Sequence, residues 1–148
     1  MASFRYSYQK IVDLKTSEKT QAEWLLSSAI GALQAEELSL SELRAMRTEW
    51  ESMQHESSKV AVALSELQQV QQYLDYLDAC INSKLVDIQL AKKVVDHNRS
   101  KLTDKMKDEK VWMKAKDHAS ERFRYAMQIK EQNELDEMAT VRYIASAR

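Results

Sequence analysis

The 148-residue sequence contains no proline and a single glycine, Gly31. Because these two residues supply most tight turns and interrupt helices, a fold built from many short elements lacks the residues that it needs. Charged residues make up 30% of the chain and apolar residues 44%, which suits a few long amphipathic helices with one apolar stripe each. The sequence therefore predicts an all-α fold.

Other features are also missing. The single cysteine, Cys80, excludes a disulfide within the chain. No apolar run approaches the roughly 20 residues that a helix needs to cross a membrane. The N-terminal stretch MASFRYSYQK lacks the hydrophobic segment of a signal peptide. We therefore expect a cytoplasmic protein without a membrane span.

The motifs of common enzyme classes are absent as well. His55, His97 and His118 lie far apart, and none has a second histidine three or four residues away, as a zinc pair on a helix requires. One glycine cannot make a glycine-rich phosphate loop, and a thin pair of helices offers no enclosed pocket for catalysis. We expect no enzymatic activity, no metal site and no cofactor.

Charge is balanced overall but unevenly distributed. The formal net charge is −1, with acidic residues predominating over 33–78 and basic residues over 84–130. This asymmetry favours packing of the two regions against each other, or attraction to a charged partner. Acidic residues are interleaved through the basic region and no nucleic-acid-binding motif is present, so we expect no nucleic-acid partner.

Apolar residues recur at alternating spacings of three and four, which is typical of the seam of a coiled coil. In the first half, the predicted seam consists of Ala22, Leu26, Ala29, Leu33, Glu36, Leu40, Leu43, Met46, Trp50 and Met53. In the second half it consists of Leu67, Val70, Leu74, Leu77, Ile81, Leu85, Ile88, Ala91, Val95, Leu102, Met106, Met113, Ala119 and Phe123. Its last third also includes Arg99, Glu109 and Lys116, where we expect shallower burial.

A coiled coil needs a second strand, which can come from the same chain folded back. Residues 54–64, QHESSKVAVAL, have the weakest helical pattern, and Ser65 to Gln68 fit a capping box. We predict one antiparallel two-helix hairpin over 1–148, with helices at about 4–55 and about 65–146 and a turn at about 56–64. The second helix is longer, so its end beyond about residue 120 has no partner. The apolar pattern also continues through the turn, so one unbroken helix in an intermolecular coil stays an alternative.

Two stretches are candidate contact surfaces. Near the predicted turn, Leu43, Met46 and Trp50 lie at matching heights to Cys80, Leu77 and Tyr73 in the hairpin. Large aromatic rings strain a two-stranded seam, so we expect Trp50, Tyr73 and Tyr76 to protrude as a partner site.

Near the end of the chain, EQNELDEMATVRY places Glu131, Glu134 and Glu137 along one side of a helix. An exposed helix face holds a metal poorly, so these acids indicate a solvated or contact surface.

Three stretches of the sequence resemble the flagellar FliJ family in order and placement. The N-terminal FRYSYQKIVDLKTSEKTQAE is similar to the family's start, at Phe4, Tyr8, Gln9, Lys10, Ile11, Leu14, Lys15, Glu18, Lys19 and Ala22. The central SELQQVQQYLDYL is similar to the start of its second helix. The closing motif is similar at Glu131, Gln132, Leu135, Asp136, Glu137, Ala139 and Arg142. The sequence departs from the family at the turn, where many members carry a glycine.

The resemblance implies a stalk-like, non-enzymatic component of the flagellar type III export apparatus, cytoplasmic and peripherally associated with the inner face of the cell membrane. It implies three partners, namely the export ATPase hexamer, the linker of the export-gate membrane protein, and the flagellar export chaperones. ATPase-ring contacts would involve Gln9, Lys10, Glu131, Gln132, Leu135, Asp136, Glu137 and Arg142. Gate contacts would involve Leu43, Met46, Trp50, Tyr73, Leu77 and Cys80.

Two alternatives come from other functional classes. A long coiled coil also suits a structural protein that assembles with itself into a filament or scaffold. A third interpretation is a chaperone that binds secretion substrates directly.

Overall fold

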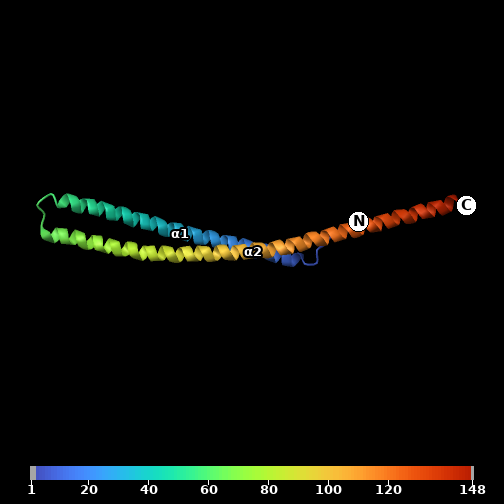
Figure 1. Ribbon diagram of the computed structural model, residues 1–148, viewed down its shortest axis with the longest axis horizontal. Coiled ribbons are helices and arrows are strands. Elements are labelled where there is room, and N and C mark those ends of the chain that lie inside the picture. The colour runs from blue at the N-terminus through green and yellow to red at the C-terminus, as the bar shows by residue number, and fades with distance from the viewer. Residues whose placement is uncertain (1–2, 148) are drawn as a thin grey trace. The chain divides into compact units, whose positions relative to one another are not determined.

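A computed structural model describes residues 3–147 and contains two long helices, α1 (Gln9–Ser57) and α2 (Leu64–Ser146). The structure confirms the predicted all-α antiparallel hairpin with a longer second helix, and the described residues include no strand (Figure 1). The predicted domain over 1–148 also included Met1, Ala2 and Arg148, which lie outside the described residues. None of the described helices has an apolar stretch long enough to span a membrane.

The chain divides into two compact units, which we describe separately. The tip unit comprises residues 21–103 and includes the turn between the helices. The terminal unit comprises the described residues 3–20 and 104–147, which hold the start of α1 and the last part of α2.

The core of the tip unit is a narrow line of apolar side chains between the two helices. Leu77 is its most deeply buried member, with 1% of its surface exposed. The other buried residues of this unit are Ala22, Ala29, Leu40, Leu74, Ile88 and Val95. All of them belong to the predicted seam, so the three–four spacing correctly identified the face that each helix buries.

Polar contacts across the tip unit fix the antiparallel register. Lys84 Nζ donates to Glu36 Oε2 at 2.9 Å, and Gln54 Nε2 donates to Gln71 Oε1 at 2.7 Å. In these pairs the residue number falls on α2 as it rises on α1, as an antiparallel arrangement requires. The predicted seam position Glu36 is therefore half-buried because a lysine from the other helix neutralises it.

Several seam predictions were wrong by one residue. Met46, Met53, Leu85, Met106 and Met113 are exposed by 37–51%. The half-buried positions are instead Arg47, Gln54, Lys84, Lys105 and Trp112. Long basic side chains can cover a seam with their aliphatic stems and still bring their charged ends to an acid on the other helix. Arg99 is likewise exposed, and Asn98 replaces it, donating to the Leu25 carbonyl at 3.5 Å.

The turn forms without any residue in the left-handed region. No described residue has a positive φ, so the glycine expected from the resemblance is not required here. At the end of α1, the Ser58 hydroxyl donates to the His55 carbonyl at 2.6 Å. Because α2 begins at Leu64, Ala63 takes the capping position predicted for Ser65, and its carbonyl accepts from the Glu66 amide at 3.0 Å.

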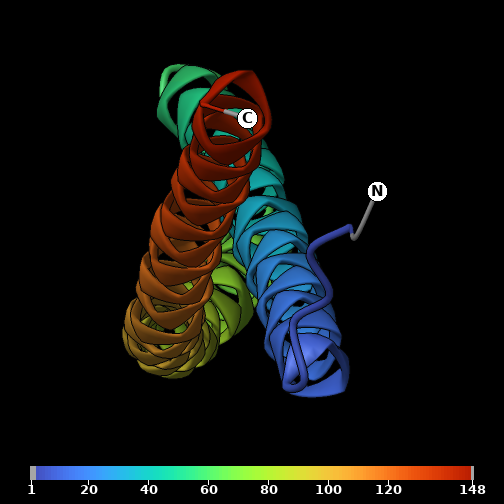
Figure 2. The same ribbon diagram turned by 90° about the vertical axis from the view of Figure 1, so that its right-hand side faces the viewer.

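In the terminal unit, the chain before α1 is extended, visible as the blue loop in Figures 1 and 2. Its Phe4 ring lies 5.5 Å from the Phe123 ring of α2 between centroids, and Tyr8 lies 6.0 Å from Trp112. Helix α1 therefore begins at Gln9, later than the predicted start near residue 4, because an extended segment brings these rings onto α2.

Ion pairs also link the two helices of the terminal unit. Lys19 Nζ lies 3.0 Å from Glu109 Oε1, and Lys105 Nζ lies 3.3 Å from Glu18 Oε2. Glu109 and Lys116 are half-buried, as predicted for the seam. The Lys19 hydrogen bond lowers the pKa of Glu109 below its ordinary value, and the Lys105 hydrogen bond does the same for Glu18.

Acidification is therefore expected to destabilise the hairpin. A carboxylate whose pKa is lower in the folded state adds stability above its unfolded pKa, here 4.5, and loses it as the pH falls through the folded pKa. Thermal unfolding followed by circular dichroism at pH 7 and pH 3 should show a smaller pH-dependent drop in Tm for Glu109→Gln than for the wild type. The matched control is Glu134→Gln, at an exposed position, which should keep the wild-type difference. An unchanged pH dependence in Glu109→Gln would contradict this role for the pair.

Candidate functional site

The six residues predicted near the turn, here called the tip cluster, all lie in the tip unit: Leu43, Met46, Trp50, Tyr73, Leu77 and Cys80. The structure brings Trp50 and Tyr73 together across the hairpin, with ring centroids 4.6 Å apart and a tilt of 54° between the rings. Tyr76 continues the row, with its ring centroid 6.1 Å from that of Tyr73. Aromatic residues from both helices therefore form one continuous group.

Members of the tip cluster differ in their accessibility to a partner. Leu77 is 1% exposed and belongs to the core, so its side chain packs between the helices and not on the surface. Trp50 and Tyr73, which were expected to protrude, are instead half-buried against each other, whereas Met46 is 40% exposed. Tyr76, which was expected to protrude but was not among the six, is 62% exposed. A partner would therefore meet Met46 and Tyr76 together with the outer edges of Trp50 and Tyr73.

Arg47 connects the two helices beside this aromatic group. Its guanidinium donates to the Asp78 carboxylate of α2 through Nε, and to Glu51 Oε2 at 2.8 Å through Nη1. The hydrogen bond to Asp78 is the main cause that raises the pKa of Arg47. Glu51 lies on α1 and Asp78 on α2, so of these two bonds the one to Asp78 joins the helices, close to Trp50 in the sequence.

The side chains of the tip cluster, and of Tyr76 beside it, are mainly apolar or aromatic. The hydrogen-bonding interaction with Cys80 is the main cause that raises the pKa of Tyr76 above its ordinary value. Over the described residues, no group of three or more histidine, cysteine or acidic side chains is placed to hold a metal ion. Exposed aromatic and methionine side chains instead supply adaptable apolar contact area.

The second predicted surface lies entirely in the terminal unit, but its two halves are separate. Lys10 is exposed at the start of α1, where Gln9 Nε2 donates to Asp13 Oδ1 at 2.9 Å. These residues directly follow Tyr8, which contacts Trp112. The acidic stretch of α2 starts roughly 20 residues beyond Trp112, which places it about 30 Å further along the helix. The structure therefore does not join the two halves into one patch.

Residues 128–147, which are the last part of α2 and Ala147 after it, are here called the C-terminal face and are all exposed. The predicted contact residues Glu131, Gln132, Leu135, Asp136, Glu137 and Arg142 belong to this stretch. Gln132 Nε2 donates to Asp136 Oδ1 at 3.1 Å, and the Thr140 hydroxyl donates to the Asp136 carbonyl at 2.8 Å. These contacts stay within the helix, so the side chains remain available to a partner.

Large apolar side chains are exposed along the C-terminal face. They are Ile129, Leu135, Met138, Val141, Tyr143 and Ile144, each between 45% and 75% exposed. At about 100° per residue, these six positions point in different directions around the helix axis. The face therefore lacks the single apolar stripe of a helix that packs on one flat surface.

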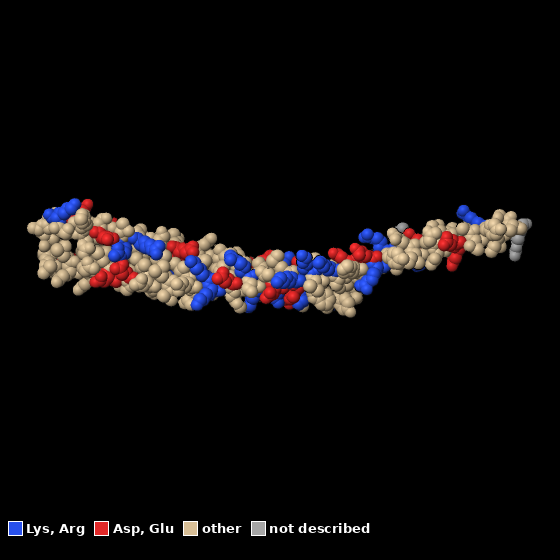
Figure 3. Space-filling model, viewed as in Figure 1, with Lys and Arg blue, Asp and Glu red and all other residues tan. Residues whose placement is uncertain are grey.

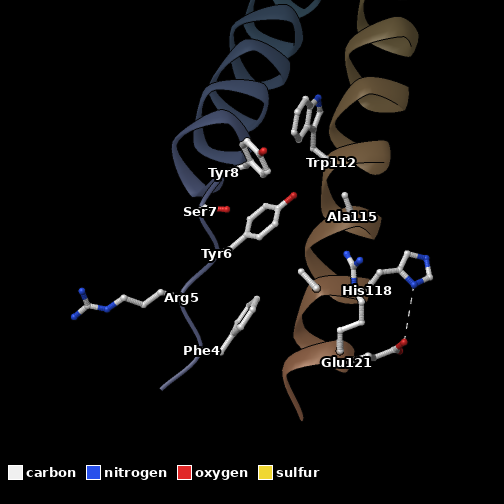
Figure 4. Close-up of a pocket in the computed structure, with 11 residues that line it drawn as sticks. Phe4, Arg5, Tyr6, Ser7, Tyr8, Trp112, Ala115, His118 and Glu121 are labelled. Carbon is white, nitrogen blue, oxygen red and sulfur yellow. Dashed lines mark ion pairs between the residues drawn. The ribbon is translucent and has the colours of Figure 1, made fainter. Parts of the chain in front are cut away.

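Sequence reasoning missed a groove between the extended N-terminal segment and α2. Figure 4 shows Tyr6 and Tyr8 turned toward the side of Trp112, with Arg5 pointing away from α2. Phe4, Ala115, His118 and Glu121 also line this groove. The signal was the alternation FRYSY, because aromatic residues at every second position share one side of an extended chain.

The family model described as flagellar FliJ protein matches residues 4–148. Among solved structures, a putative YscO homolog from Chlamydia trachomatis is similar, with a TM-score of 0.60, 18% sequence identity and coverage of 94% of both chains. At this identity the likeness concerns the fold alone. The comparison with curated proteins finds no match.

Proposed function

Because the chain belongs to the flagellar FliJ family, we propose that it acts as a non-enzymatic stalk of the flagellar type III export apparatus. In this role the C-terminal face binds the hexameric export ATPase and the tip cluster contacts the linker of the export gate. The hairpin also escorts export chaperones. It works in the cytoplasm, peripherally associated with the inner face of the cell membrane.

The main support for ATPase binding is the distribution of apolar residues around the C-terminal face. Exposed apolar side chains on a soluble helix favour a partner that covers them. Leu135 and Ile144 lie about 180° apart around the axis, so a flat surface can cover only one of the two. A ring that surrounds a single helix covers both. Charged residues lie between these apolar positions, including Glu134, Glu137 and Arg142. They suit polar residues on the inner surface of such a ring.

The direct test is the ATPase rate of the cognate hexamer with and without this protein. We expect the chain to increase the rate and to co-purify with the ATPase in a pull-down. An unchanged rate together with no binding would contradict the proposed role. Binding without a change in rate would support an escort role and exclude stimulation of the ATPase.

The proposed gate contact predicts that Trp50→Ala and Tyr73→Ala weaken binding of the purified gate linker in calorimetric titrations. Both rings are half-buried and lie outside the line of buried core residues, so both variants should remain helical by circular dichroism. Tyr125→Ala, at a position 67% exposed in the terminal unit, is the matched control and should bind normally. Loss of the helical signal in either ring variant would identify the rings as core residues.

The alternative of a self-assembling coiled coil draws on the same exposed apolar residues of the C-terminal face. Light scattering separates the two functions. A hairpin stalk should give the monomer mass of 17.2 kDa, whereas a filament or scaffold protein should give a multiple of it. A stable dimer at low protein concentration would favour the alternative.

A further inference from the structure

The outer face of α1 in the tip unit, on the side away from α2, has an unusual surface. Trp24, Gly31, Leu38 and Ala45 are spaced seven residues apart, so they follow nearly one line along the helix. Trp24 is 75% exposed and Leu38 is 62% exposed, and Gly31 and Ala45 are exposed as well. Large and small residues therefore alternate along this line, here called the outer stripe.

The outer stripe and its neighbours lack the charges expected on the outside of a coiled coil. No charged residue occurs from Trp24 to Ala35, and the neighbouring positions are Ser27, Ser28, Gln34, Ala35 and Ser41. Outer positions of a coiled coil normally carry polar or charged residues because they face water. In the tip unit, the equivalent outward positions on α2 are Gln72, Ala79, Val86, Lys93 and Ser100, all of them exposed. Lysine and arginine (blue) and aspartate and glutamate (red) occur at many places on the face of the molecule shown in Figure 3. Residues 24–35 of α1 contribute none of these charges.

The charges that border the outer stripe are mainly acidic. Glu42 and Glu49 lie about 50° from the stripe on one side, and Glu23 and Glu37 lie about 100° away on the other. All four are exposed, and Arg44 is the exposed basic residue among them. Two copies of this face packed together would bring these carboxylates close to like charges. A helix with basic edges would meet opposite charges instead.

We propose that the outer stripe binds one helix of a partner protein, with an apolar stripe at its centre and lysine or arginine at its edges. A large side chain of that helix would fit over Gly31, between Trp24 and Leu38. The stripe from Trp24 to Ala45 is about 32 Å long, so the partner helix needs about six turns. None of the four stripe residues belongs to the tip cluster or to the C-terminal face.

Gly31 allows a sharp test because a Cβ added there meets no heavy atom within 4 Å. Gly31→Leu should therefore preserve the hairpin, and replacing a mid-helix glycine should raise its stability. The same leucine fills the space that a partner side chain needs. We expect Gly31→Leu to keep or raise Tm and to lose binding, a combination that a folding defect cannot produce.

The probe is a synthetic fluorescent amphipathic peptide of about six helical turns, with leucines at heptad spacing and lysines at the edges. Its twin carries glutamates in place of the lysines. By fluorescence anisotropy, wild-type protein should bind the lysine peptide saturably, and Gly31→Leu and Trp24→Ala should bind it at least tenfold more weakly. Ser100→Leu, at an exposed outward position on α2, is the matched control and should bind like the wild type.

Three results would overturn the proposal. Equal binding of the lysine peptide by the wild type and Gly31→Leu would show that charge alone attracts it. Equal binding of the two peptides would exclude the basic edge. Finally, light scattering that gives a multiple of 17.2 kDa for the wild type and a monomer for Gly31→Leu would identify a second copy of the chain as the occupant.

Discussion

Leu77→Ala is expected to lower the free energy of unfolding by about 2–5 kcal/mol, the range for removal of a large buried aliphatic side chain. Leu77 is 1% exposed and is the largest fully buried side chain among the described residues. Typical domains are stable by about 5–15 kcal/mol, so this loss is a large fraction of the total. Urea unfolding followed by circular dichroism at 222 nm measures it directly.

Two variants separate packing from partner contact at this position. Leu90→Ala, at a position 55% exposed on the same helix, should change stability by no more than about 0.5 kcal/mol. Leu77→Met conserves side-chain volume and should lower the free energy of unfolding by less than about 1.5 kcal/mol. If Leu77→Ala loses gate binding because it unfolds, Leu77→Met should still bind the gate linker. A fully stable Leu77→Ala that fails to bind the gate linker would contradict the core role and make Leu77 a contact residue.

The fold was predictable because helix-breaking residues are nearly absent and the three–four spacing is continuous. The same pattern did not identify every seam residue. At Met46 and Arg47, the sequence favours the methionine because it is apolar, yet Arg47 is the half-buried residue and Met46 is exposed. The salt bridge between Arg47 and Asp78 decides which of the two residues is half-buried, and this bridge depends on the register of the second helix. A pattern along one helix carries no information on that partner.

The candidate sites show a similar limit. Matching heights in a hairpin correctly indicated that Trp50 and Tyr73 lie side by side, because antiparallel register follows from the turn position. Which of the tip residues reach solvent depends on side-chain direction. Spacing alone therefore could not identify Leu77 as buried and Tyr76 as exposed. At the N-terminus, the sequence predicts that the first helix begins at about residue 4, whereas α1 begins at Gln9. Packing of Phe4 on Phe123 favours an extended chain there.

Removal of the residues after Met127 should abolish stimulation of the export ATPase while leaving the Tm of the hairpin unchanged. The deleted part contains the whole C-terminal face, whose described residues are all exposed, so little packing is lost with it. The helical signal should fall only in proportion to the residues removed. A truncated chain that still stimulates the hexamer fully would show that ring contact lies elsewhere in the terminal unit, with Gln9 and Lys10 as the remaining predicted residues.

A pair of point substitutions tests the geometry of that contact. Leu135 and Ile144 are 60% and 53% exposed and point in opposite directions around α2, about 180° apart. If the ATPase surrounds the helix, Leu135→Gln and Ile144→Gln should each reduce stimulation, because each side chain meets its own part of the lining. If the ATPase offers one flat surface, only one of the two variants should lose activity. Equal and separate losses from opposite sides of one helix are therefore the result that favours a ring over a groove.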